Sequence, residues 1–104
     1  MTEVDVSAVI AISDDCPELE EILQQYSAEF EDRTIVYEFI LVLDGLGERR
    51  AARLKERIPS GMPVRVMQFN QPFGPERALA SGHREALGRV SVSLPGYLQI
   101  DPGD

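Results

Sequence analysis

The chain has 104 residues, a formal net charge of -8, and 43% hydrophobic and 27% charged residues. This composition predicts one globular domain over residues 1–104, large enough to bury a core. No apolar run approaches the roughly 18 residues of a membrane span, and the acidic start is unlike a signal peptide, so a cytoplasmic protein is expected. The negative charge disfavours nucleic acid as a partner.

Apolar strands alternate with helical patterns along the chain. The first strand is expected at residues 4–12, and a helix follows from Pro17, which suits a first helical position. An apolar stripe at helical spacing then predicts the buried face of that helix. The stripe consists of Leu19, Ile22, Leu23, Tyr26 and Phe30.

The second half repeats the alternation. A strand is expected at residues 35–43, a short basic helix at 48–58 and a third strand at 63–69. Gly74 and Pro75 open a third helix, which has a small-residue face suited to close packing on a sheet, and residues 90–94 form a fourth strand. The small-residue face consists of Ala78, Leu79, Gly82 and Ala86.

This alternation is typical of an α/β domain with a mainly parallel sheet and helices on both faces, a three-layer Rossmann-like arrangement. Right-handed crossovers favour the strand order 3-2-1-4. Ligands of such sheets bind outside the carboxyl ends of the strands, near the switch point between the first and fourth strands. Residues 13–16, 44–47 and 95–97 are therefore expected to converge on one crevice.

Three carboxylates at this expected crevice have two interpretations each. Asp14 and Asp15 can accept hydrogen bonds from a nucleotide, or can cap the helix that follows. Asp44 can also contact a nucleotide, or can form a turn with Gly45, because Asp bonds nearby backbone and Gly allows positive φ. Both interpretations stay open from the sequence.

Other reactive side chains favour structural roles. His83 has no neighbouring metal ligand or serine motif, so a solvent-facing or helix-packing role is preferred to catalysis. Cys16 is the only cysteine, which fits a reducing compartment, and a helix N-terminus nearby can lower its thiol pKa. Basic residues gather on the second helix, where a solvated face is expected. They are Arg49, Arg50, Arg53, Lys55 and Arg57.

Several segments match the motif order of one enzyme family. Residues 6–15 resemble an opening strand and its Pro-x-Tyr-Asn-Glu loop, and residues 37–45 a second strand that ends in Asp-Asp-Gly-Ser. Residues 70–74 match an Asn-Phe-Gly turn before an Ala-rich helix. The pattern resembles the family-two glycosyltransferases of A-type fold, most closely the dolichyl- and polyprenyl-phosphate sugar transferases, over residues 4–102.

The motifs themselves are altered. In that family, an Asp-x-Asp motif after the fourth strand holds a divalent metal on the sugar-nucleotide diphosphate. Here Pro95, Gly96 and Tyr97 occupy that place, so the resemblance implies neither a metal cofactor nor a catalytic residue. It does imply nucleotide contacts at the positions that match the family's motifs. These are Ala11, Ser13, Asp14, Asp15, Asp44, Gly45 and Tyr97.

Three functions remain open from the sequence. The first is a degenerate, inactive module that binds a nucleotide or nucleotide sugar, and the second is an interaction protein that keeps only the fold. The third is a shortened transferase, without the family's acceptor half, that another segment or chain completes. Residues 90–94 contain no charge or proline to protect an open sheet edge, which predicts a homodimer through the fourth strand.

Overall fold

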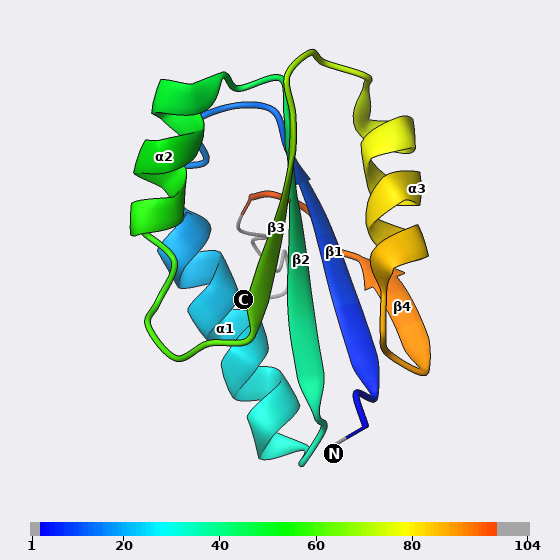
Figure 1. Cartoon of the computed structure of the whole chain (residues 1–104). Coiled ribbons are helices and arrows are strands. Elements are labelled where there is room, and N and C mark those ends of the chain that lie inside the picture. The colour runs from blue at the N-terminus through cyan, green and yellow to red at the C-terminus, as the bar shows by residue number, and fades with distance from the viewer. Residues whose placement is uncertain (1–2, 98–104) are drawn as a thin grey trace, which may run out of the picture.

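The computed structural model describes residues 3–97, which form a four-stranded sheet between helices (Figure 1). The strands are β1 (Val6–Ile12), β2 (Tyr37–Asp44), β3 (Val64–Phe69) and β4 (Val90–Ser93), and the helices are α1 (Leu19–Asp32), α2 (Glu48–Glu56) and α3 (Pro75–Glu85). Every pairing is parallel and the order is β3-β2-β1-β4. The predicted α/β class and strand order are confirmed, with element bounds shifted by one or two residues.

Helices cover both faces of the sheet, with α1 and α2 on one face and α3 on the other (Figure 1). The central strands β1 and β2 are almost wholly apolar because both of their faces are buried. Successive side chains enter different cores: Ile10 and Leu41 pack under α1 and α2, whereas Val9 and Ile40 pack under α3. None of the helices within residues 3–97 has the length and apolar character to cross a membrane.

Helix α1 presents the predicted stripe to the sheet. Leu19, Ile22 and Leu23 are buried, and Tyr26 and Phe30 pack partly buried against the same core. The two aromatic rings continue toward the amino end of β2, where Phe30 stacks on Tyr37 with ring centroids 5.1 Å apart. The apolar face of α1 therefore covers the sheet along the length of the helix.

The start of α1 corrects one sequence interpretation. The helix begins at Leu19 rather than at Pro17, and its N-cap position is Glu18. Asp14 and Asp15 are therefore not the helix cap that one interpretation expected. Asp14 Oδ1 instead accepts the backbone N–H of Cys16 at 2.9 Å, which stabilises the turn that precedes the helix.

Helix α3 lies unusually close to the sheet. A Cβ atom at Gly82 would come within 2.4 Å of Val9 Cγ1 and 3.0 Å of Val42 Cγ2. The predicted small-residue face is therefore what allows this approach. His83, on the same helix, places Nδ1 2.7 Å from the Ser91 hydroxyl and Nε2 2.8 Å from the Ser93 hydroxyl, so it ties α3 to β4 and has the packing role expected of it.

A buried carboxylate lies at the amino end of the sheet, on the face that α3 covers. Glu38 Oε2 accepts the Ser7 hydroxyl at 2.6 Å and the Leu87 amide at 2.9 Å. Its Oε1 accepts Arg65 Nε at 2.9 Å. The Gly88 amide donates in turn to the Ser7 hydroxyl at 2.8 Å. One side chain thus joins β1, β2, β3 and the loop between α3 and β4.

Candidate functional site at the carboxyl edge of the sheet

Two loops meet at the carboxyl ends of β1 and β4, where the sequence predicts a crevice. The Cys16 thiol donates to the Gly96 carbonyl oxygen, with Sγ and O 3.5 Å apart. A Cβ atom at Gly96 would lie 3.3 Å from the Ala11 carbonyl oxygen. The segment after β4 therefore lies against the end of β1 and the β1–α1 loop.

The polar candidates on these loops face solvent. Ser13, Asp14 and Asp15 are all exposed, and the Tyr97 side chain is 62% exposed. Ala11 is half-buried at the end of β1 and packs on the core beneath α3. The exposed side chains are thus accessible to a ligand, whereas Ala11 contributes to the packing beneath them.

Asp44 and Gly45, the remnant of the second motif, are engaged with the β3–α3 loop. Asp44 is only 4% exposed, its Oδ1 accepts the Phe73 amide at 2.8 Å and its Oδ2 accepts the Gly74 amide at 3.0 Å. Gly45 has a φ of +78°, and a Cβ atom there would lie 2.8 Å from the Pro72 nitrogen. The turn interpretation was correct about positive φ at Gly45 but wrong about the partner, because Asp44 bonds a distant loop rather than its own turn.

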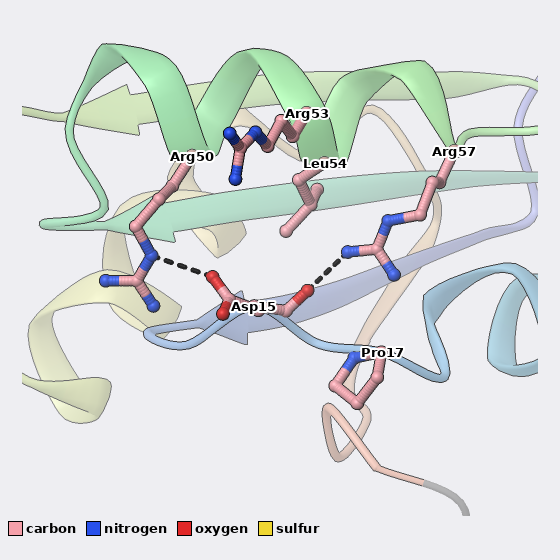
Figure 2. Close-up of a pocket in the computed structure, with 6 residues that line it drawn as sticks. All are labelled: Asp15, Pro17, Arg50, Arg53, Leu54 and Arg57. Carbon is pink, nitrogen blue, oxygen red and sulfur yellow. Dashed lines mark hydrogen bonds and ion pairs between the residues drawn. The ribbon is translucent and has the colours of Figure 1, made fainter.

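The basic helix fastens the β1–α1 loop (Figure 2). Arg50 Nε lies 2.7 Å from Asp15 Oδ1. Arg57 donates from Nη1 to the Cys16 carbonyl oxygen at 2.8 Å and from Nη2 to the Asp15 carbonyl oxygen. The expected solvated face is found at Arg49, Arg50, Arg53 and Lys55, which are exposed. Arg57, just after the end of α2, departs from it because its side chain is half-buried against the loop that it bonds.

Cys16 also differs from its expectation. Burial is the main cause that raises the pKa of its thiol, and the nearby Asp14 charge raises the pKa further, against the opposing charge of Arg57. The predicted lowering by a helix N-terminus is wrong because the side chain is 2% exposed and packs in the core beneath α1 and α2. Cys16 is therefore unsuited to act as a nucleophile.

Residues 95–97, at the place of the family's metal motif, do not fit a divalent metal. Pro95 and Gly96 have no side-chain ligand, and Tyr97 offers only a phenol where the family motif has carboxylates. Within residues 3–97, no three His, Cys, Asp or Glu side chains gather in a way that would hold a metal ion. No chemical step is therefore assigned to a metal in this part of the chain.

The fold and its polar carboxyl edge define a Rossmann-like α/β domain. Comparison with curated proteins shows which enzymes its sequence is similar to. Undecaprenyl-phosphate 4-deoxy-4-formamido-L-arabinose transferase of Edwardsiella ictaluri is 30% identical over 98 residues, which make up 93% of this chain and 30% of that protein. The Pseudomonas fluorescens protein of the same name is also 30% identical, over 93% of this chain and 29% of its own length. Dodecaprenyl-phosphate galacturonate synthase of Rhizobium johnstonii is 24% identical over 97% of this chain and 30% of its own length.

The chain is a distant homologue of the family-two polyprenyl-phosphate sugar transferases over nearly its whole length. It spans about 30% of the length of the curated relatives that it matches. No protein-family model matches the chain. The resemblance drawn from the altered motifs is thus confirmed at the level of the family relationship.

Proposed function

We propose that this chain is a degenerate nucleotide-binding domain of the glycosyltransferase type, which binds a nucleotide or nucleotide sugar weakly and without a metal. The observation that carries the proposal is the contact between Cys16 and Gly96, because it brings the segment after β4 against the β1–α1 loop. This arrangement leaves Asp14, Asp15 and Tyr97 exposed at the edge where parallel α/β sheets bind ligands.

The altered motifs explain why the affinity should be low. A metal would neutralise the diphosphate charge, but Pro95, Gly96 and Tyr97 provide no carboxylate for one. Asp44 already accepts two backbone amides of the β3–α3 loop, so a nucleotide must compete for it or bind without it. We therefore expect a dissociation constant in the millimolar range, about -4 kcal/mol.

Titration with uridine and guanosine diphosphates and their sugars tests this function. By NMR, saturable shifts should appear at Ser13 to Asp15, and by calorimetry manganese should leave the affinity unchanged. Tyr97→Ala should weaken binding because an exposed ring can stack on a base. The matched control is Leu87→Ala, an exposed apolar side chain in the α3–β4 loop, which should have no effect. Micromolar binding that requires manganese would refute the proposal. So would the absence of any saturable shift at ligand concentrations well above the expected dissociation constant.

We also propose that the 104 residues transfer no sugar by themselves. Transfer requires stabilisation of the leaving group and a positioned base. Residues 95–97 carry no carboxylate that could hold a metal, and the buried carboxylate of Asp44 already accepts two backbone amides. The double change Pro95→Asp and Tyr97→Asp should give manganese binding, measured by calorimetry, without turnover. Donor-dependent glycosylation by the unmodified chain would contradict this statement.

We also propose that the chain forms a homodimer through β4. Within residues 3–97, β4 pairs only with β1, so its other edge has no neighbouring strand. Val90 at the start of this strand is 56% exposed. An uncharged open edge of this kind favours pairing with a second copy of the chain.

A further inference from the structure

A pocket of about 270 Å³ lies between α2 and the β1–α1 loop (Figure 2). Its lining consists of Asp15, Pro17, Arg50, Arg53, Leu54 and Arg57. Three guanidinium groups and one carboxylate line it, so the pocket has a local charge of two positive units although the whole chain carries -8. This concentration of positive charge is the feature to be explained.

The contacts of the three arginines leave most of that charge available. Arg57 donates to the backbone carbonyl oxygens of Asp15 and Cys16, which position its guanidinium without neutralising it. The Arg53 side chain has no hydrogen bond or ion pair with the rest of the described chain, residues 3–97. Arg50 forms an ion pair with Asp15, and both of these side chains are substantially exposed, at 45% and 76%. Such an exposed pair is weak and can exchange for another anion.

Two apolar side chains, Leu54 and Pro17, complete the lining beside the charged ones. Leu54 is 1% exposed beneath the arginines, and Pro17 closes the side toward α1. In Figure 2, Arg50 and Arg57 reach Asp15 from its two sides, and Arg53 lies between them on the same helix. Guanidinium groups remain charged at any physiological pH and match phosphate oxygens with paired N–H donors.

We propose that this pocket is a binding site for a phosphate group, held by Arg53 and Arg50 beside the fixed Arg57. The phosphate oxygens take the contact that Asp15 now makes with Arg50. In this way arginines supply positive charge at the β1–α1 loop without a metal. Neither nucleotide binding nor sugar transfer is required by the proposal, because inorganic phosphate contains no base and no sugar.

The test is an NMR titration of the chain with sodium phosphate and with pyrophosphate, with sodium chloride keeping the ionic strength constant. Saturable shifts are expected at the Arg53 side chain and at the amides of Asp15 and Leu54. Arg53→Gln should weaken phosphate binding about tenfold. The matched control is Arg49→Gln, which removes the same charge from the same helix but outside the pocket lining, and it should change the affinity less than twofold.

A change at Asp15 should alter the phosphate affinity in the opposite direction. It therefore distinguishes a ligand site from a structural ion pair. Asp15→Asn removes the competing carboxylate and should strengthen phosphate binding severalfold, whereas the folded state is retained in the NMR spectrum. Tighter binding of pyrophosphate assigns the pocket to a diphosphate, and equal binding assigns it to a single phosphate group. Absence of saturable shifts, equal effects of Arg53→Gln and Arg49→Gln, or weaker binding by Asp15→Asn would each overturn the proposal. A failed nucleotide titration would leave it intact.

Discussion

Glu38 is a buried carboxyl group whose pKa is shifted by its surroundings. Burial alone raises the pKa of this carboxyl group and is the largest single effect. Hydrogen bonds from Ser7, Arg65 and the Leu87 amide, with the Arg65 charge, act together in the other direction and hold the pKa below its ordinary value. The ionised carboxylate therefore stabilises the fold, and the contribution depends on pH.

Glu38→Gln should lower the free energy of unfolding at pH 7 by about 2 kcal/mol, because the amide cannot accept all three hydrogen bonds and leaves the Arg65 charge unpaired. Since the folded pKa is the lower one, the loss is complete above the unfolded pKa of about 4.3 and shrinks as pH falls through the folded pKa. Urea unfolding from pH 7 to pH 3 measures this. Glu56→Gln, an exposed control, should change stability by less than about 0.5 kcal/mol. A gap that stays constant down to pH 3 would contradict the assigned pKa shift.

At the scale of elements, the contact of α3 with the sheet shows how packing overrides helix propensity. Gly82 lies within the helix, where alanine is ordinarily more favourable by about 1 kcal/mol. A Cβ atom there would approach Val9 Cγ1 to 2.4 Å, which no side chain tolerates without a shift. The glycine is thus required by the distance between helix and sheet.

Gly82→Ala should therefore destabilise the domain by about 1 to 2 kcal/mol, with overpacking exceeding the gain in propensity. Adding Val9→Ala should remove the closest contact, the one at 2.4 Å, so the double variant should be more stable than the sum of the two single effects predicts. Thermal or urea unfolding of the unmodified chain, the two single variants and the double variant completes this double-mutant cycle. Strict additivity, or stabilisation by Gly82→Ala alone, would show that α3 does not pack this closely.

At the scale of the whole molecule, the open edge of β4 predicts the oligomeric state. Val92 packs inward on the core, so Val90 is the better position for a test. Sedimentation at micromolar concentration should show a dimer, and Val90→Lys should shift it to monomer because a charge on an edge strand opposes pairing. The control is Leu87→Lys, at a residue that is 67% exposed and lies outside the strand. This change should leave the dimer intact. A monomeric unmodified chain would rule out the homodimer.

The sequence by itself determined the class of fold and the order of its strands. Alternation of apolar strands and amphipathic helices is a local property, and right-handed crossovers then leave few arrangements of a parallel sheet. The same reasoning placed the β1–α1 loop and residues 95–97 at one edge, where the Cys16–Gly96 contact brings them together. The altered motifs were likewise sufficient to indicate the family relationship.

Only the tertiary structure decided what individual polar residues contact. Asp44 bonds amides 29 and 30 residues further along the chain, Asp15 pairs with Arg50 35 residues away, and the burial of Cys16 reverses the expected direction of its pKa shift. Such partners follow from how distant segments meet in space, and the periodicity of a single segment carries no information about them. For that reason the sequence located the edge on which a site would lie, whereas the arginine pocket at that edge emerged only when α2 packed beside the β1–α1 loop.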